Sequence, residues 1–197
     1  MLDVLVLISG SGSNLRALAT AAAHEDYPAR IVAVGSDGEA SGLAHAEEFG
    51  IPSFVVDPGA FESRESWADE LRAQIEAWNP DLIVCAGFMR ILPAGFVRAF
   101  APRIINLHPA LLPRYPGAHA VRDALADGAT VTGSTVHIVD EGVDTGPVLR
   151  QVEVAVASDD TEGTLHDKIK VIERPLLVAT VAEIARGEIN VKEYARA

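Results

Sequence analysis

Short apolar runs and longer amphipathic stretches alternate along the chain. The apolar runs are rich in Val, Ile and Leu and have no polar face, which is typical of strands buried on both faces of a parallel sheet. In the first half of the chain they predict strands over residues 4–8, 31–34, 54–56, 82–86 and 103–107. Between them, the spacing of apolar positions predicts helices over residues 15–23, 41–49 and 61–78. This order predicts an α/β fold with a mostly parallel, doubly wound, Rossmann-like sheet that carries helices on both faces.

The pattern changes after His108. Three prolines within the eight residues 109–116 predict a stiff, irregular loop. A short helix over 121–126, strands over 131–139 and 148–156, and a closing helix over 161–186 follow. The two strands are expected to form an antiparallel pair or the mixed edge of the sheet. Pro175 is expected to interrupt the closing helix, because proline removes a helical hydrogen bond and disfavours helical geometry at the residue before it.

Composition limits the partners and the location. The 197 residues contain 16 Lys and Arg against 28 Asp and Glu, a net charge of -12, which argues against a surface for nucleic acid or an anionic membrane. Cys85 is the only cysteine, so an intramolecular disulfide and a cysteine-based zinc site are excluded. The apolar run at the start ends at Ile8, too early for a signal peptide, and no stretch approaches the ~20 apolar residues of a membrane helix. We therefore expect a cytoplasmic protein.

A glycine-rich loop, Ser-Gly-Ser-Gly-Ser-Asn over residues 9–14, joins the first predicted strand to the first helix. Glycines allow close approach of the backbone, and free N–H groups at a helix start attract an anion. The loop lacks the Lys-Ser/Thr of a Walker A motif, and a dinucleotide fingerprint fails where its third glycine would fall on Leu15. Asp37, near the end of the second strand, keeps a nucleotide site as an alternative. A tight turn without a ligand is the other alternative.

Two polar residues end the fifth predicted strand. Asn106 and His108 lie two apart, so their side chains share one face of an extended chain, at the end of a parallel sheet where ligands bind. Asn can donate to a developing oxyanion, and His can carry a proton near neutral pH. Asp144, in a glycine-bounded turn, is the type of residue that orients an imidazole. The alternative is that Asn106 caps a turn and that His108 packs beneath the proline loop.

Four segments carry a more specific signal, over residues 8–15, 85–92, 105–113 and 133–147. The third contains Asn-x-His-Pro-x-Leu-Leu-Pro from Asn106, and the fourth contains Asp-x-Gly-x-Asp-x-Gly-Pro from Asp140. Together, in this order and spacing, the segments resemble the phosphoribosylglycinamide formyltransferase family. The resemblance implies one formyltransferase domain over 1–197, with a phosphate-binding half over 1–100 and a catalytic and folate-binding half over 101–197.

The reaction implied by the resemblance is direct transfer of a formyl group from 10-formyltetrahydrofolate to the amine of glycinamide ribonucleotide in de novo purine synthesis, without a metal. Folate is then a co-substrate, and a homodimer is an allowed assembly. By the same resemblance, Asn106 stabilises the oxygen of the tetrahedral centre, His108 moves protons and Asp144 supports His108. His137 is expected near the site, with no chemistry assigned to it.

The resemblance also implies two binding sets. The folate set is Arg64, Met89, Arg90, Ile91, Leu92, Asn106, Val139, Asp140, Glu141, Gly142, Val143 and Asp144. The ribonucleotide set is Gly12, Ser13 and Asn14 for the phosphate, with Lys170, Val171, Ile172 and Glu173 on the closing helix. Without the resemblance, Lys170 and Glu173 are a solvated charge pair, Ile91 and Leu92 are core, and Arg64 is a surface arginine. Pro175 departs from the family pattern two residues after Glu173.

Two relatives with the same catalytic core and one unrelated class are the alternatives. Methionyl-tRNA formyltransferase carries an added C-terminal domain, and formyltetrahydrofolate deformylase an added N-terminal one. The first predicted strand begins by Val4 and the chain stops soon after the closing helix, so the purine enzyme is expected. A non-catalytic nucleotide-binding module would use the glycine loop but would leave Asn106, His108 and Asp144 unexplained.

Overall fold

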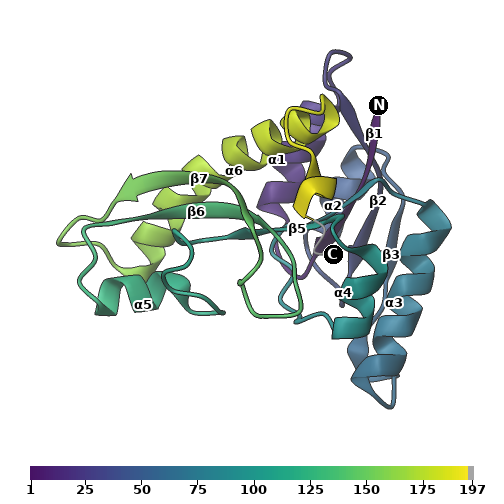
Figure 1. The fold of residues 1–197 in the computed structure, drawn as a ribbon, viewed down its shortest axis with the longest axis horizontal. Helices are drawn as coiled ribbons and strands as arrows, with labels where there is room; N and C mark the ends of the chain where they lie inside the picture. The colour runs from purple at the N-terminus through teal and green to yellow at the C-terminus, as the bar shows by residue number, and fades with distance from the viewer. Residues whose placement is uncertain (195–197) are drawn as a thin grey trace.

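One seven-stranded sheet organises the computed structural model, which describes residues 1–194 (Figure 1). The strands are β1 (Leu2–Ile8), β2 (Ala29–Ser36), β3 (Ser53–Val55), β4 (Leu82–Cys85), β5 (Ile104–His108), β6 (Val131–Ile138) and β7 (Val148–Ala155). Their order in the sheet is β3-β2-β1-β4-β5-β6-β7. Strands β1 to β5 pair in parallel, whereas β6 pairs antiparallel with both β5 and β7. The predicted mostly parallel sheet with a mixed C-terminal part is confirmed.

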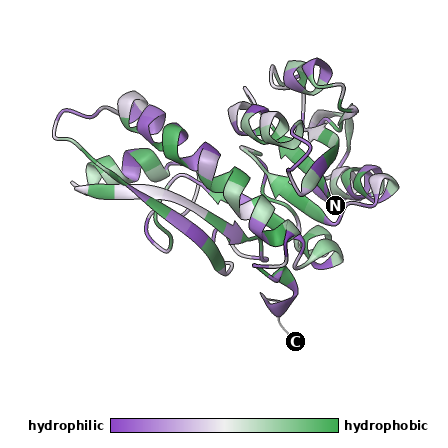
Figure 2. Ribbon diagram, turned by 90° about the horizontal axis from the view of Figure 1, so that it is seen from above, coloured by the Kyte–Doolittle hydropathy of each residue, from purple (hydrophilic) through white to green (hydrophobic). Residues whose placement is uncertain are grey.

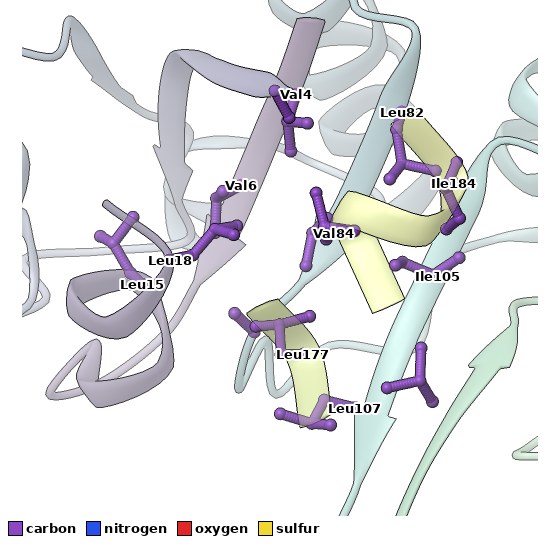
Figure 3. Packing of buried hydrophobic residues seen from close by; sticks show 14 of the residues in the cluster. Val4, Val6, Leu15, Leu18, Leu82, Val84, Ile105, Leu107, Leu177 and Ile184 are labelled. Carbon is purple, nitrogen blue, oxygen red and sulfur yellow. The ribbon is translucent and has the colours of Figure 1, made fainter. Parts of the chain in front are cut away.

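Helices cover both faces of the parallel part. They are α1 (Ser13–Ala22), α2 (Leu43–Glu48), α3 (Arg64–Trp78), α4 (Ala94–Phe100), α5 (Ala120–Ala126) and α6 (Glu162–Ala185), with 3-10 turns η1 (Pro58–Ala60) and η2 (Val191–Tyr194). Successive side chains of a strand point to opposite faces, so β1 serves both layers. Val4 and Val6 pack with residues of α1 and α6 (Figure 3), whereas Leu5 and Leu7 pack with residues of α3 and α4. The central strands are accordingly mostly hydrophobic, and the helices have mixed hydropathy (Figure 2).

Beyond the parallel strands, β6 and β7 extend as an arm together with α5 and the first half of α6 (Figure 1). A small separate cluster of Val121, Leu165 and Ile169 fills the space between these elements. Because β6 runs antiparallel to β5, it brings residues far along the sequence back beside β5, and β7 then pairs antiparallel with β6. The candidate site described below depends on this position of β6 beside β5.

Three details differ from the expectation. The helix predicted from Phe61 begins at Arg64, because the Ser63 side chain accepts from Ser66 N and the Ser66 hydroxyl in turn accepts from Ser63 N, a capping box. The short helix α4 was not predicted. The predicted interruption at Pro175 is wrong, because α6 is continuous from Glu162 to Ala185. Residues buried at both ends of α6, such as Leu165 and Val181, hold it in place and offset the hydrogen bond that proline removes.

The carboxyl ends of the parallel strands meet along one edge. Here the loop after β1 (9–12), the loop after β4 (86–93) and the loop after β5 (109–119) lie on the same edge of the sheet. The sheet order changes direction between β1 and β4. Ligands of open α/β sheets bind at such a point.

Candidate active site

A cavity of about 290 Å³ opens at this edge. Its lining comes from the loop after β4, the end of β5, the proline loop, β6 and the turn between β6 and β7. Of the predicted site residues, those lining it are Met89, Arg90, Ile91, Leu92, Asn106, His108, Val139, Asp140, Gly142, Val143 and Asp144. The three predicted catalytic residues and most of the predicted folate set therefore meet in one place.

Strand pairing explains why the polar side chains converge. Asn106 and His108 lie two apart on β5, as predicted, and His137 on β6 is the cross-strand partner of Asn106. Residues directly opposite in an antiparallel pair project from the same face. Asp144 lies in the turn between β6 and β7, and its carboxylate faces the imidazoles of His108 and His137. Its Oδ2 lies 3.4 Å from His108 Nδ1, and its Oδ1 lies 3.5 Å from His137 Nε2.

The turn that carries Asp144 is built by short-range contacts. Asp140 Oδ1 accepts from Gly142 N at 3.1 Å and from the Thr145 hydroxyl at 2.7 Å. A Cβ at Gly146 would fall 1.8 Å from the carbonyl oxygen of Ile138, so this position requires glycine. Asp144 itself has φ 55, a left-handed conformation that Asp tolerates better than most residues. The motif from Asp140 to Pro147 therefore forms a turn that projects the Asp144 carboxylate into the cavity.

Asp144 is an ionised carboxylate. Burial raises its pKa, but hydrogen bonding from the His137 side chain, the Gly117 N–H and the charges of the two histidines in their protonated forms outweigh burial and bring the pKa to about 2. The Gly117 N–H donates to Asp144 Oδ2 at 2.7 Å. The turn is therefore fastened to the proline loop, and its negative charge persists at neutral pH.

His108 is buried, with 4% of its surface exposed. Burial lowers the pKa of its imidazole below 6.5, and the charge of Asp144 and the Tyr115 carbonyl oppose this shift only in part. Its Nε2 lies 2.8 Å from the Tyr115 carbonyl oxygen, which can only accept, so Nε2 carries the proton of the neutral ring. Nδ1 is then the free base, and a proton taken up there faces Asp144.

We expect the acid limb of the kcat profile to lie below pH 6.5, because His108 works as a base only in its neutral form and its pKa is lowered from 6.5. Replacing Asp144 with Asn removes a charge that raises the His108 pKa, so the limb should move to still lower pH. The measurement is kcat against pH for both proteins. A limb that moves to higher pH in the Asp144→Asn variant would contradict this assignment.

His137, which the sequence placed near the site without a role, lies within the polar cluster. Its Nδ1 lies 2.9 Å from the Ile138 carbonyl oxygen, which fixes the proton on Nδ1 and leaves Nε2 to accept from Asn106 Nδ2 at 3.1 Å. His137 is 2% exposed and orients the amide of Asn106. The register of β5 with β6 places His137 beside Asn106, and the hydrophobic periodicity of the sequence does not reveal this register.

Replacing His137 with Ala should lower kcat by roughly tenfold, because the Asn106 amide loses the acceptor that orients it but keeps its own N–H groups. The KM for the formyl donor should change little. Steady-state kinetics of the variant test this, with His166→Ala on the exposed face of α6 as the control. An unchanged kcat would show that Asn106 does not depend on His137.

The loop after β4 is anchored residue by residue. Ser9 N donates to the Gly87 carbonyl at 3.0 Å, and Met89 N donates to the Ser9 hydroxyl at 2.8 Å. Phe88 stacks on Trp67 with ring centroids 6.4 Å apart. The remaining anchors are the contacts of Arg90 with Asp37 and of Arg64 with the Ile91 carbonyl, together with burial of Leu92. The side chains of Met89 and Ile91 are exposed at the mouth of the cavity.

Two residues of the predicted folate set do not line this cavity. Glu141 points to α4, where both of its carboxylate oxygens accept from Arg98 Nη1 at 3.0 Å. Arg64, at the start of α3, lines a neighbouring cavity of about 500 Å³ that shares Met89, Arg90 and Ile91 with the first. The two cavities therefore adjoin along this loop.

The glycine loop forms the start of α1. Gly12 has φ 67, and a Cβ there would lie 2.9 Å from the Cα of Gly42, so both residues must be glycine for the loops to touch. Asn14 Nδ2 donates to Glu173 Oε1 at 3.0 Å, and both residues are buried. Asn14 Oδ1 is also buried and has no hydrogen-bond partner.

The predicted residues of α6 fall into two groups. Glu173 reaches the glycine loop through Asn14, despite Pro175. Lys170 Nζ lies 3.3 Å from Asp167 on its own helix, and Val171 is exposed. The bond between Glu173 and Asn14 thus fastens α6 to the start of α1, beside the glycine loop.

We expect Gly12→Ala to raise the KM for the ribonucleotide at least tenfold while the KM for folate changes less than twofold. The added methyl group displaces the Gly42 backbone and moves the N–H groups at the start of α1. The ratio of the two KM values is the measurement, and Gly10→Ala is the matched control, since a Cβ at Gly10 meets nothing within 4 Å. Equal increases in both values would contradict a dedicated phosphate site.

Neither a metal site nor a membrane-spanning helix is found among the described residues 1–194. Among residues 1–194 no group of three or more His, Cys, Asp or Glu side chains is arranged to hold a metal ion. None of the helices described is both long and apolar enough to cross a membrane. The Asp37 carboxylate, which a nucleotide site would need, is bonded to Arg90.

Comparison with known proteins identifies the family of the chain. The family model for formyl transferases matches residues 2–181. Phosphoribosylglycinamide formyltransferase from Mycobacterium tuberculosis is 52% identical over 188 residues, which are 95% of this chain and 87% of that protein. The protein of the same name from Escherichia coli is 38% identical over 195 residues, 98% of this chain and 92% of that protein. The structure of glycinamide ribonucleotide transformylase 1 from Symbiobacterium toebii matches with a TM-score of 0.92 and 38% identity, covering 95% of this chain and 89% of that chain.

The fold, the site and the family match together define a formyltransferase, and the chain belongs to the formyl transferase family. Its relatives over nearly the whole length are phosphoribosylglycinamide formyltransferases, and the chain belongs with them. The resemblance read from the four sequence segments is confirmed.

Proposed function

We propose that this chain transfers the formyl group of 10-formyltetrahydrofolate to the amine of glycinamide ribonucleotide, with Asn106, His108 and Asp144 as the catalytic residues. One observation carries the proposal: these three side chains converge on a cavity of about 290 Å³ beside an anchored loop suited to a flat ring. The step is proposed to belong to purine synthesis, since a relative from Homo sapiens is named trifunctional purine biosynthetic protein adenosine-3.

The chemistry requires one new bond, one broken bond and one proton relayed. The amine attacks the formyl carbon, the carbonyl oxygen becomes an oxyanion, and the bond from carbon to N10 of the folate then breaks. The amine must lose a proton, and N10 must gain one. His108 Nδ1 takes the proton and returns it, and Asp144 stabilises the imidazolium in between. The Asn106 amide donates to the oxyanion.

Direct transfer is consistent with the lining of the cavity. Within the described chain the lining contains one thiol, Cys85, and no hydroxyl side chain. Cys85 is buried and desolvation raises the pKa of its thiol to about 12, so it is a poor nucleophile. A thioester or an ester intermediate on a thiol or hydroxyl therefore has no suitable side chain here.

The two substrates are proposed to approach from different sides. The pterin ring lies in the cavity against residues 89–92 and 139–144, and the benzoyl-glutamate tail extends to Arg64 in the adjoining cavity. The ribonucleotide phosphate binds the N–H groups of residues 12–14, and Glu173, fixed by Asn14, accepts from its hydroxyl or amine groups. Lys170, Val171 and Ile172 contribute the neighbouring surface of α6.

The proposal extends to location and assembly. The protein acts in the cytoplasm on small molecules, without a nucleic acid or membrane partner, and it can form a homodimer. Sedimentation velocity over a range of concentrations tests the dimer. A single species with the mass of one chain at every concentration would refute it.

An acceptor panel tests the function. The purified chain is given 10-formyltetrahydrofolate with glycinamide ribonucleotide, with initiator methionyl-tRNA, or with water alone, and release of tetrahydrofolate is followed. We expect release that depends on the ribonucleotide and is at least about 10³-fold faster than with water. Equal release with the tRNA or with water would point to one of the two related activities instead.

A further inference from the structure

Asp37 is a buried charge with no part in the chemistry above. It follows the end of β2, 8% of its surface is exposed, and Arg90 Nε donates to its Oδ2 at 2.5 Å. Ser36, the last residue of β2, shapes the turn, since its hydroxyl donates to the Gly38 carbonyl at 2.8 Å. The carboxylate is therefore held in a defined place.

The pair joins the ends of two strands that are not neighbours in the sheet. β1 lies between β2 and β4, and the loop after β4 reaches the end of β1, where Met89 N donates to the Ser9 hydroxyl. From there the Arg90 side chain extends to Asp37 at the end of β2, and its Nε is bonded to that carboxylate.

The consequence falls on the loop after β4. Residues 87–92 have no regular structure, and two of their side chains, Met89 and Ile91, are exposed. Such a loop is held in one conformation only by the contacts along it. The bond from Met89 N to the Ser9 hydroxyl is one anchor and the bond from Arg90 to Asp37 is the next. Both anchors sit on strand ends next to the glycine loop, which itself is fastened to the β2 side where Gly42 N donates to the Gly10 carbonyl at 3.0 Å.

We propose that Asp37 is a positioning residue for the folate subsite, which acts by holding Arg90 and the backbone of residues 89–91 in the conformation that receives the pterin ring. The proposal rests on the proposed function only in naming folate as the ligand of this loop. Asp37 does not itself line the cavity and reaches it only through its bond to Arg90, so its effect must appear in folate binding and not in the chemical step.

The test is Asp37→Asn, which keeps the size of the side chain and removes its charge. Tetrahydrofolate binding is measured by titration calorimetry, and KM and kcat are measured for both substrates. We expect the dissociation constant and the KM for folate to rise about tenfold, because the hydrogen bond from Arg90 loses its charge assistance at a carboxylate that is itself buried. The KM for the ribonucleotide and kcat should stay within about twofold of wild type.

The matched control is Asp3→Asn. Asp3 also pairs with an arginine, Arg30 at 2.6 Å, but at the opposite edge of the sheet, where β1 and β2 begin. It should leave both KM values unchanged. Arg90→Gln alone and combined with Asp37→Asn completes a cycle in which the double variant should bind folate no worse than the weaker single one.

The results distinguish a failure of the proposed function from a failure of the inference about Asp37. If wild type forms no product from the ribonucleotide but Asp37→Asn still weakens tetrahydrofolate binding, the proposed function fails and the inference stands. If wild type turns over normally and Asp37→Asn binds tetrahydrofolate as tightly as wild type, the inference is overturned. Equal rises in both KM values, or additive effects in the cycle, overturn it as well, because they would show general destabilisation of the site.

Discussion

The His108→Ala variant should form product about 10²–10⁴-fold more slowly than wild type at saturating substrates. The variant lacks the one base whose free Nδ1 faces a carboxylate in the cavity. Substrate binding should be nearly unaffected, because His108 acts on the proton in transit and not on the bound ground state. The measurement is kcat at pH 7.5, well above the lowered pKa of His108.

Asp144→Ala should also lower kcat by at least about 10²-fold, and the double variant should be little worse than His108→Ala, since the two residues act as a unit. The fold should persist, because the contacts of the His108 backbone remain, including its carbonyl bond from the Ser134 hydroxyl at 3.2 Å. Circular dichroism checks this, and His166→Ala serves as the unaffected control. Near-normal turnover of a folded His108→Ala protein would remove His108 from the chemistry.

The second large effect is expected at Asn106. Asn106→Asp, which has the same shape, should lower kcat about 10²–10³-fold by replacing an oxyanion donor with a carboxylate. The new charge would also repel a developing oxyanion and approach Asp144. Steady-state kinetics and tetrahydrofolate binding are compared with wild type. A variant with weakened folate binding and unchanged kcat would show that Asn106 binds the co-substrate but does not stabilise the transition state.

Much of the fold follows from local patterns. Val4 and Val6 are buried on one face of the sheet and Leu5 and Leu7 on the other, which explains why an uninterrupted apolar run predicts a strand between two helical layers. Pro175 shows the limit of such reasoning. Proline destabilises an isolated helix, but in α6 the burial of side chains before and after it outweighs that local cost.

The residues of the candidate site were likewise predictable from the sequence only in part. Strand periodicity alone places Asn106 and His108 on one face, whereas the position of Asp144 was suggested by its turn and supported by the family resemblance. His137 and Asp37 were not assigned a role, for one reason. Their partners, Asn106 and Arg90, lie 31 and 53 residues away in sequence, and only the register of β5 with β6 and the order of the parallel strands bring them together.

The most direct test follows the formyl carbon itself. Donor labelled at the formyl group is mixed with the enzyme and glycinamide ribonucleotide, the reaction is stopped at intervals, and the label is located. The account predicts one labelled formyl group on the ribonucleotide amine for each tetrahydrofolate released, with none on the protein. Label accumulating on the protein before product forms, or released as formate in step with tetrahydrofolate, would contradict direct transfer at this site.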